Sequence, residues 1–541
     1  MSSARSVHRA AWRARRGGAA LLAACGLLLA GCSSGGGPQA PAGGRPAPRS
    51  TAGDSVTPGS AAPTALRPLP AATPAALLPY YRQKLAWHAC DGSFECATFR
   101  VPLDYARPGA GDLTLTAARK KATGAGHARV GSLLLNPGGP GGSAVSYLEG
   151  VAGTFAAPVR AAYDLVGFDP RGVGRSSPVQ CLAGPRMDAY AAADTTPDTP
   201  AEVDALVRLD REFAAGCEQR SGRSLPHVGT VDAARDMDVL RALLGDAKLH
   251  YLGKSYGTYL GAVYAGLFPG RVGRMVLDGA LDPSLDARRA ALGQASGFET
   301  AWSSFARDCV THADCPFGRT TAAAGRSLDA LLRSIDRKPL PAGGGRRLTE
   351  ALATTGVIQA MYADFLWPQL RTAAKDALRG DGKALMALAD AYYERRSDGG
   401  YDNLMYANMA VNCLDMSAPF PGPRQVAAAV PAFVRASPHF GRAMAWMSLT
   451  CAYWPVKSVG GPRTVTAAGA PPIVVVGTTR DPATPYAWAR SLAAQLSSGR
   501  LVTFRGDGHT AYGNRSDCVD TAVNTYLLEG EAPPEDKTCA S

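Results

Sequence analysis

The chain has 541 residues and a formal net charge of +12, with 57 lysines and arginines against 45 aspartates and glutamates. Five of the arginines fall within the first 31 residues, which hold no acid, so the charge beyond that segment is about +7. So mild a basic surplus on a long chain is useful near an anionic envelope, but it is far from the clustered charge of a nucleic-acid-binding protein. We therefore expect no nucleic-acid partner.

The first residues have the pattern of an export signal. Arginines precede an apolar run, Ala19–Ala30, which is too short to span a bilayer. Leu29-Ala30-Gly31-Cys32 matches a bacterial lipobox, in which the cysteine thiol is lipidated. We expect residues 1–31 to be a signal peptide and Cys32 to anchor an exported protein to the outer face of the cell membrane. An ordinary secretory signal cleaved nearby, giving a secreted protein, is the alternative.

Residues 32–75 are rich in Gly, Pro, Ala and Ser and have few large apolar side chains. Such a segment cannot bury enough surface to fold. We expect it to be a flexible tether between the anchor and about 465 folded residues.

Two glycine-rich loops follow strand-like runs in the first half of the chain. Residues 130–135 lead into Asn-Pro-Gly-Gly-Pro-Gly-Gly-Ser at 136–143, and residues 163–168 lead into a charged loop at 169–176. The first loop lacks the spacing and the lysine of a phosphate-binding P-loop. Its glycines let the backbone approach a substrate closely, and we expect the N–H of Gly139, with Gly138 as the fallback, to be one donor of an oxyanion hole.

The most informative motif is Gly253-Lys254-Ser255-Tyr256-Gly257, where a short apolar run turns into a helical pattern. G-x-S-x-G between a strand and a helix is a nucleophile elbow. Glycine is needed on both sides of Ser255 because side chains there would collide with neighbouring backbone. The turn exposes the Ser255 hydroxyl and leaves the Tyr256 N–H at a helix N-terminus, where it is the second expected oxyanion donor.

Two later strand-like runs each end near a polar residue suited to catalysis. Residues 472–477 precede Asp481, and residues 501–504 precede His509. Parallel strands gather their carboxyl ends at one edge of a sheet, so Ser255, Asp481 and His509 are expected to meet there. The chain order Ser, Asp, His is that of the α/β-hydrolase fold.

Two other aspartates compete for the acid role. Asp278 ends the strand after the elbow helix, where some hydrolases of this fold place their acid. Asp507 lies only two residues from His509 and is badly placed to receive the imidazole Nδ1–H from behind. We prefer Asp481.

The predicted architecture is an α/β-hydrolase fold with a mostly parallel central sheet and an inserted, mainly helical cap. Helical patterns at 322–335, 349–365 and 370–393 lie between the catalytic elements, which favours a cap over a separate interaction domain. The predicted parts are the first core part at 76–283, the cap at 284–464 and the second core part at 465–541.

Ten cysteines remain when Cys25 and Cys32 are set aside, and an even number in an exported chain indicates disulfides. The sequence alone leaves the connectivity open. Because no C-x₂-C pairs or clustered histidines occur, we expect neither a metal nor another cofactor. Pairing neighbours along the chain gives Cys90–Cys96, Cys181–Cys217, Cys309–Cys315, Cys413–Cys451 and Cys518–Cys539.

Six motifs occur in one order along the chain: P-G-G-P-G, F-D-P-R-G-V-G-R-S, G-K-S-Y-G-T-Y-L-G, V-L-D-G-A-L-D-P, D-P-A-T-P and G-D-G-H-T. Together they resemble the secreted tripeptidyl aminopeptidase group of actinobacterial α/β-hydrolases, related to prolyl aminopeptidases. The resemblance covers roughly residues 76–541 and implies that Ser255 is the nucleophile, Asp481 the orienting acid and His509 the general base. Prolyl aminopeptidases typically have His before these glycines, whereas Pro137 stands here, which favours the tripeptidyl branch.

The resemblance implies a serine exopeptidase that releases short peptides, tripeptides foremost, from partners with a free N-terminus. Such an enzyme needs a carboxylate at a fixed distance from Ser255 to bind the ammonium group, and Glu299 and Asp415 in the cap are the candidates. An esterase, lipase or thioesterase of the cell envelope could use the same triad, and a non-catalytic ligand-binding lipoprotein is a third hypothesis. The oligomeric state is unknown from the sequence.

Overall fold

The computed structural model describes residues 62–124, 129–513 and 515–540. The predicted signal peptide, the predicted lipidation site Cys32 and most of the predicted tether lie outside the described residues. Within the described ranges, no helix is both long enough and apolar enough to cross a bilayer.

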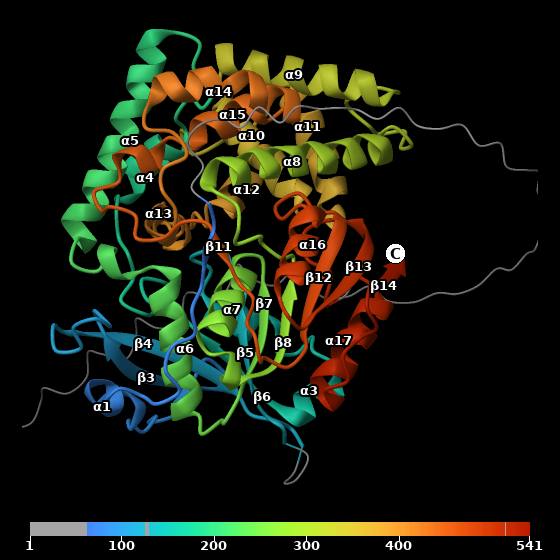
Figure 1. Ribbon diagram of the computed structural model, residues 1–541. Helices are drawn as coiled ribbons and strands as arrows, with labels where there is room; N and C mark the ends of the chain where they lie inside the picture. The colour runs from blue at the N-terminus through green and yellow to red at the C-terminus, as the bar shows by residue number, and fades with distance from the viewer. Residues whose placement is uncertain (1–61, 125–128, 514, 541) are drawn as a thin grey trace, which may run out of the picture. The chain divides into compact units, whose positions relative to one another are not determined.

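A ten-stranded sheet lies at the centre of the fold, in the order β14-β13-β12-β8-β7-β5-β6-β4-β3-β2 (Figure 1). From β14 to β6 neighbouring strands run parallel, whereas β4, β3 and β2 pair antiparallel. This arrangement confirms the predicted α/β-hydrolase fold. The strands are β2 (His88–Cys90), β3 (Phe94–Pro102), β4 (Asp112–Lys120), β5 (Gly131–Asn136), β6 (Tyr163–Phe168), β7 (Leu249–Lys254), β8 (Val272–Asp278), β12 (Ile473–Arg480), β13 (Gly499–Asp507) and β14 (Lys537–Ala540).

Helices cover both faces of this sheet. In β12, Ile473 and Val475 enter one apolar core, while Val474 and Val476 enter the other. Because alternate side chains of a strand point to opposite faces, a strand buried on both sides reads as the uninterrupted apolar run seen in the sequence. One core includes α6 (Thr230–Leu243), α7 (Tyr256–Leu267) and α16 (Tyr486–Gln495); the other includes α2 (Ala144–Val151), α3 (Ala157–Ala162) and α17 (Asp517–Glu529).

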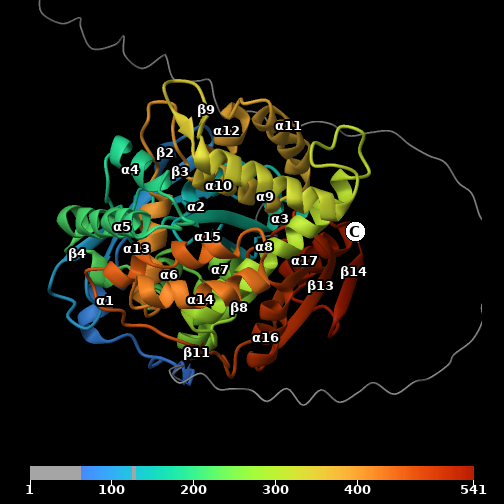
Figure 2. The ribbon, with the colours of Figure 1, turned by 90° about the horizontal axis from the view of Figure 1, so that it is seen from above.

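Between β8 and β12 the chain leaves the sheet and forms a cap of helices, seen above the strands in Figure 1 and in front of them in Figure 2. Two short strand pairs lie outside the main sheet: β9 (Leu340–Pro341) with β10 (Arg347–Leu348), and β1 (Thr64–Ala65) with β11 (Arg463–Thr464). The cap helices are α8 (Ala287–Cys309), α9 (Thr321–Arg337), α10 (Glu350–Met361), α11 (Trp367–Leu378), α12 (Lys383–Tyr392), α13 (Leu404–Asp415), α14 (Pro423–Ala436) and α15 (Gly441–Met447).

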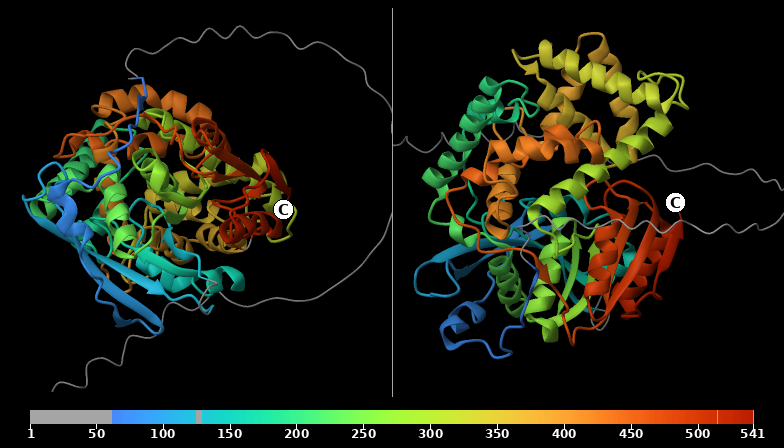
Figure 3. Two further views of the ribbon diagram at one scale, coloured as in Figure 1. Left: turned by 60° about the horizontal axis from the view of Figure 1, so that its bottom comes forward. Right: turned by 45° about the horizontal axis from the view of Figure 1, so that its top comes forward.

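Two helices from the first core part also pack with the cap. Helices α4 (Gly184–Ala191) and α5 (Pro200–Ser221) follow β6, and α5 stands beside the cap helices in Figure 3. The hydroxyl of Thr450 is 2.9 Å from that of Tyr190 and donates to Asp210 at 2.7 Å. Leu206 of α5 joins an apolar cluster with Phe433 and Trp446 of the cap, whereas Phe213 joins the cluster that includes the sheet.

The helical pattern predicted at 370–393 is two helices rather than one. Helix α11 ends at Leu378 and α12 begins at Lys383. Gly380 between them has φ +93°, a left-handed conformation in which glycine commonly ends helices.

The predicted tether ends earlier than residue 75. Strand β1 (Thr64–Ala65) pairs in parallel with β11 (Arg463–Thr464), and the N–H of Leu69 donates to the carbonyl of Leu267 at 2.8 Å. These backbone hydrogen bonds join the end of the Gly/Pro-rich segment to the folded part. Composition does not reveal them, because they depend on the backbone and not on side chains.

All five predicted disulfides are present: Cys90–Cys96, Cys181–Cys217, Cys309–Cys315, Cys413–Cys451 and Cys518–Cys539. Each bond closes a short stretch of chain, with sequence separations between 6 and 38 residues. Pairing by neighbours worked because local loops bring these cysteines together.

Candidate active site

Ser255 lies in the turn between β7 and α7 in a strained conformation, with φ 55° and ψ −126°. A Cβ atom on Gly253 would lie 2.4 Å from the carbonyl oxygen of Gly257, and one on Gly257 would lie 2.8 Å from that of Asn136. The turn therefore requires both glycines of the motif. The N–H of Ser255 donates to the carbonyl of Asp278 at 2.9 Å, which ties the turn to the next strand.

Asp481, in the loop after β12, faces the imidazole of His509. Both carboxylate oxygens are 2.9 Å from His509 Nδ1, and the carboxylate also accepts the N–H groups of Ala483, Thr484 and Thr510. An ionised carboxylate can only accept hydrogen bonds, so Nδ1 carries the proton and Nε2 keeps its lone pair. Nε2 is buried and has no hydrogen-bond partner among the described residues. Nε2 is therefore the ring nitrogen that can accept a proton from a nucleophile.

Ser255 and His509 flank the same short turn at the end of β8. A Cβ atom on Gly279 would lie 3.2 Å from His509 Cε1, and the preceding residue, Asp278, accepts the N–H of Ser255. From the cap side, Tyr362 accepts the N–H of His509 at 2.8 Å, with ring centroids 5.5 Å apart. The histidine is held from the sheet and from the cap.

Asp278 has a different role from Asp481. Its carboxylate accepts the N–H groups of Ala511 and Tyr512, both at 2.9 Å, and no hydrogen bond joins it to the His509 ring in the described part of the chain. Complete burial raises the pKa of Asp278. Lys254 supports the same loop by donating to the carbonyl of Tyr512 at 2.7 Å. Asp278 therefore positions the loop that carries the histidine.

Asp507, the other aspartate considered for the acid role, is paired elsewhere. Two guanidinium nitrogens of Arg480 lie 2.7 Å from its two carboxylate oxygens. This bidentate ion pair joins the ends of β12 and β13, which carry Asp481 and His509 on the loops that follow.

The glycine-rich loop after β5 lies against the elbow. A Cβ atom on Gly138 would lie 2.8 Å from Ser255 Cβ and 2.9 Å from the Tyr256 nitrogen, so the backbone approaches the serine as closely as glycine permits. The N–H of Gly138 already donates to Asn136 Oδ1 at 2.9 Å. The N–H of Gly139 has no acceptor in the described ranges, and the N–H of Tyr256 opens helix α7 without an intrahelical acceptor. These two amides are available for an oxyanion and that of Gly138 is not.

Asp415, one of the two residues expected to bind the ammonium group of the substrate, has its carboxylate engaged by protein donors. It is 6% exposed, and its oxygens accept both the N–H, at 2.9 Å, and the hydroxyl of Thr230. The Thr230 hydroxyl also contacts the hydroxyl of Tyr256. Burial raises the pKa of Asp415 to about 6. The residue instead anchors the side chain of Tyr256 next to the nucleophile.

Glu299, on α8, the other residue expected to bind the ammonium group, is also engaged by protein donors within the cap. One oxygen accepts the Ser437 hydroxyl at 2.9 Å and the N–H of His439 at 3.2 Å. The other oxygen lies 3.6 Å from Nε2 of the same histidine. This carboxylate joins α8 to the end of α14.

Comparison with known proteins identifies the family of this chain. The family described as TAP-like protein matches residues 437–539. The chain is 37% identical to the tripeptidyl aminopeptidase of Streptomyces lividans over 473 residues, which cover 85% of this chain and 87% of the relative. The chain belongs to the tripeptidyl aminopeptidase group of α/β-hydrolases. This serine hydrolase is also 37% identical to serine protease Hip1 of Mycobacterium tuberculosis over 484 residues, covering 85% of this chain and 92% of that protein. It is 38% identical to carboxylesterase B of Mycobacterium tuberculosis over 454 residues, covering 82% and 86%.

Three residues that hold the site of this tripeptidyl aminopeptidase-like hydrolase were missed from the sequence: Lys254, Tyr362 and Thr484. Lys254 lies inside the elbow motif, and Thr484 follows Asp481 closely enough for its N–H to reach the carboxylate, so the motifs held a signal for both. Tyr362 lies in the cap, far along the chain from every motif. No local pattern marks it, because only packing brings it onto His509.

Proposed function

We propose that the chain is a serine exopeptidase that releases short peptides, tripeptides foremost, from free N-termini. The observation that carries the proposal is the buried Nε2 of His509, which has no hydrogen-bond partner in the described residues, on a ring that lies against Gly279, next to the residue that accepts the N–H of Ser255. The likeness to the Streptomyces tripeptidyl aminopeptidase supports the substrate class.

In the first half of the proposed reaction, the Ser255 hydroxyl attacks the scissile carbonyl and passes its proton to His509 Nε2. Asp481 stabilises the imidazolium and keeps the ring in place through Nδ1–H. The N–H groups of Gly139 and Tyr256 stabilise the oxyanion of the tetrahedral intermediate. His509 then protonates the leaving amine as the C–N bond breaks, which leaves an acyl-enzyme.

In the second half, a water molecule takes the place of the leaving amine beside His509. The histidine removes one proton from the water, and the hydroxide attacks the ester carbonyl of the acyl-enzyme. A second tetrahedral intermediate collapses, Ser255 regains its proton, and the released peptide carries a new carboxylate. The groups of the chain itself supply every proton transfer.

An esterase is the second candidate, and the likeness to carboxylesterase B favours it. The same serine, histidine and oxyanion donors cleave esters as well as amides. The two functions differ in whether the enzyme requires a free ammonium group on the acyl side.

Turnover of one fluorogenic tripeptide amide, first with a free and then with an acetylated N-terminus, separates the candidates. Single-residue and dipeptide amides and a short acyl ester complete the set, with Ser255→Ala as the blank. Cleavage restricted to the free tripeptide would support the exopeptidase. Equal rates on the acetylated peptide, or a strong preference for the ester, would favour the esterase.

We also propose that the protein is exported and held at the outer face of the membrane by a lipid on Cys32. The lipobox and the apolar run before it support this proposal. Expression with Cys32→Ser, followed by detergent phase partitioning, tests it. The wild-type protein is expected in the detergent phase and the variant in the aqueous phase; equal partitioning of both would refute the anchor.

A further inference from the structure

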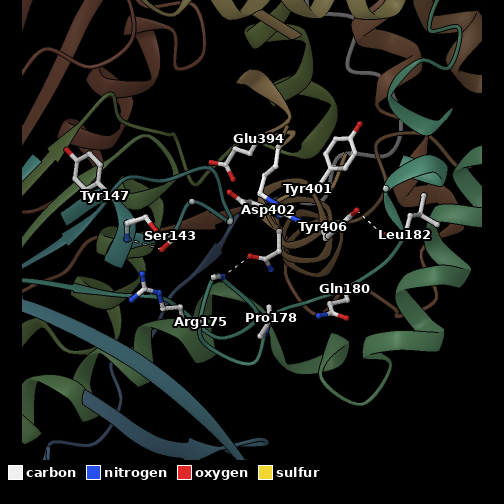
Figure 4. A pocket seen from close by; sticks show the side chains of 18 of the residues that line it. Ser143, Tyr147, Arg175, Pro178, Gln180, Leu182, Glu394, Tyr401, Asp402 and Tyr406 are labelled. Atoms are coloured by element: carbon white, nitrogen blue, oxygen red, sulfur yellow. Dashed lines mark hydrogen bonds and ion pairs between the residues drawn. The ribbon is translucent and has the colours of Figure 1, made fainter. Parts of the chain in front are cut away.

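A pocket of about 780 Å³ lies beside the glycine-rich loop that supplies the proposed oxyanion donor. Its floor includes Pro137, Gly141 and Gly142 of that loop and Tyr147 of α2. Its roof is the cap segment 394–403 between α12 and α13 (Figure 4). The pocket therefore lies between the sheet and the cap.

The pocket lies on the side of β7 opposite the strands that lead to the histidine, and it borders the glycine-rich loop that packs against the nucleophile. Pro137 lines it, and the adjacent Gly138 lies against Ser255. In the sheet, β5 and β6, whose loops contribute to the pocket, are on one side of β7; β12 and β13, which lead to Asp481 and His509, are on the other. Ser255, at the end of β7, lies between the two groups.

The chemistry of the proposed reaction orients a peptide across this site. His509 protonates the leaving amine, so the leaving part of the substrate must lie on the histidine side of Ser255. The acyl part, which carries the free N-terminus, extends the opposite way, over the glycine-rich loop toward the pocket. Three extended residues span roughly 10 Å.

The roof of the pocket connects with the roof of the proposed catalytic site. Tyr362, which contacts His509, lies with its ring centroid 6.4 Å from that of Tyr392 at the end of α12. Glu394 follows two residues later and lines the pocket. The same cap surface thus covers the histidine and reaches Glu394.

Glu394 is the carboxylate in this pocket that lacks a partner. No hydrogen bond or ion pair of its side chain occurs within the described ranges, whereas the other lining carboxylate, Asp402, accepts from Arg396 at 2.7 Å. In Figure 4 its carboxyl group points toward the side of the pocket where Tyr147 and Ser143 lie. Partial desolvation in the pocket and the negative charge of Asp402 raise the pKa of Glu394 to about 7, and its side chain stays exposed, so a cation could reach it and would be favourable there.

The segment that carries Glu394 is held in one conformation. Arg395 donates two hydrogen bonds to Asp188 on α4, at 2.6 and 2.9 Å, and the Tyr401 hydroxyl donates to the same carboxylate. Glu394 itself has φ 50°, a conformation that non-glycine residues adopt only when their surroundings enforce it. The backbone therefore presents the Glu394 carboxylate from a fixed position in the pocket.

We propose that Glu394 binds the N-terminal ammonium group of the substrate in this pocket, and that its distance from Ser255 limits the acyl part to a short peptide. The inference rests on the proposed exopeptidase function. It replaces Asp415 and Glu299, whose carboxylates are occupied by protein donors.

The test compares Glu394→Gln with the wild-type enzyme on three substrates: a free tripeptide amide, its N-acetylated form and p-nitrophenyl acetate. We expect kcat/KM for the free tripeptide to fall about 10- to 100-fold, because an ion-paired hydrogen bond is lost. The acetylated peptide and the ester are expected to change less than threefold. Glu212→Gln on α5, whose carboxylate pairs with Arg186 at 3.4 Å, removes the same charge elsewhere and should leave all three rates unchanged.

Each outcome has one meaning. If the wild-type enzyme does not distinguish free from acetylated peptide, the proposed exopeptidase function fails and the inference fails with it. If the wild type distinguishes them and Glu394→Gln still does so by the same factor, the role of Glu394 is overturned while the function stands. Should Glu394→Gln lose ester hydrolysis through misfolding, Glu394→Asp decides: a preference for the free N-terminus that is retained but weakened supports the role, and an unaltered preference overturns it.

Discussion

Asp481 places both of its carboxylate oxygens 2.9 Å from Nδ1 of His509. The contact fixes the tautomer of the imidazole and leaves Nε2 as the nitrogen able to take a proton. Since Asp481 is 2% exposed and also accepts three backbone N–H groups, the ring is held by a rigid and desolvated acceptor.

Replacing Ser255 with alanine should remove catalysis and leave the fold intact. The side chain makes no hydrogen bond in the described structure, and alanine keeps the Cβ atom that packs against Gly138. We expect kcat to fall by roughly 10³-fold or more. Steady-state kinetics with a fluorogenic tripeptide amide measures the loss, a thermal melt checks the fold, and near-normal turnover would exclude Ser255 as the nucleophile.

Asparagine in place of Asp481 should damage the reaction, and asparagine in place of Asp278 should damage stability. The first change destroys the tautomer of His509, for which we expect a loss in kcat of about 10⁴-fold. The second sets an amide NH₂ against backbone N–H donors, so about 1–3 kcal/mol of unfolding free energy should be lost, with a smaller effect on kcat. Kinetics and denaturant titration of both variants check this; the reverse order of kcat losses would move the acid to Asp278.

Alanine at Gly138 should abolish activity. Its Cβ atom would lie 2.8 Å from Ser255 Cβ, and the backbone has φ +96°, which strains any other residue. Gly150 on α2 is the matched control, since a Cβ atom there meets nothing within 4 Å. We expect Gly150→Ala to keep full activity with a slightly higher melting temperature, and an active Gly138→Ala enzyme would contradict the assigned oxyanion loop.

Asp415→Ala should lower kcat without altering the recognition of the N-terminus. The change leaves the buried N–H and hydroxyl of Thr230 without their acceptor and frees the side chain of Tyr256. Leaving these groups unsatisfied costs about 1–3 kcal/mol and allows the oxyanion donor, the N–H of Tyr256, to move. We therefore expect roughly a tenfold drop in kcat on peptide and ester alike. The ratio of rates on free and acetylated tripeptide is the decisive readout, and a collapse of that ratio would restore Asp415 as the ammonium site.

The KM for a free tripeptide should rise as the pH falls below about 7. The pKa of Glu394 is raised to about 7, so the carboxylate is ionised above that pH and increasingly protonated below it. A protonated Glu394 cannot form an ion pair with the ammonium group, and KM should rise by up to about tenfold per pH unit. Asp402, Arg396, Arg175 and Arg220 also line the pocket and set its field.

The pH dependence has an internal control. The acetylated peptide and the ester do not use Glu394 and should lack this acid limb in KM. Glu394→Gln should lack it on every substrate. A limb in KM that persists in Glu394→Gln would assign the titration to another group.

The sequence by itself determined the features that depend on short stretches of chain. The glycines of the elbow follow from contacts within a few residues of Ser255, apart from the approach of Asn136. The apolar runs of β7 and β12 follow from burial on both faces. The sequence left the disulfide connectivity open, and the pairs agree with pairing by neighbours because local loops bring these cysteines together. The parallel sheet could be predicted because each catalytic residue follows such a strand.

Only the tertiary structure decided which polar groups meet. Asp278 and Asp481 follow neighbouring parallel strands, and their patterns in the sequence do not tell which one the histidine faces. Asp415 and Glu299 are acids in the cap like any other until their donors, Thr230 and Ser437, are seen. The reason is physical: hydrogen-bond partners far apart in the sequence are chosen by how helices and strands pack, and local propensity carries no record of that packing.

The cap also combines features that the sequence predicts with features that only packing decides. Helix α5 is predictable as a helix, but its packing with the cap depends on the apolar face that α14 and α15 offer it. Glu394 was not singled out from the sequence, because its free carboxylate results from Arg395 pairing with Asp188 and Arg396 with Asp402. The sequence contains the residues of the proposed catalysis. The packing of the cap over the sheet decided that, in the described part of the chain, the Glu394 carboxylate has no protein partner and can bind a substrate.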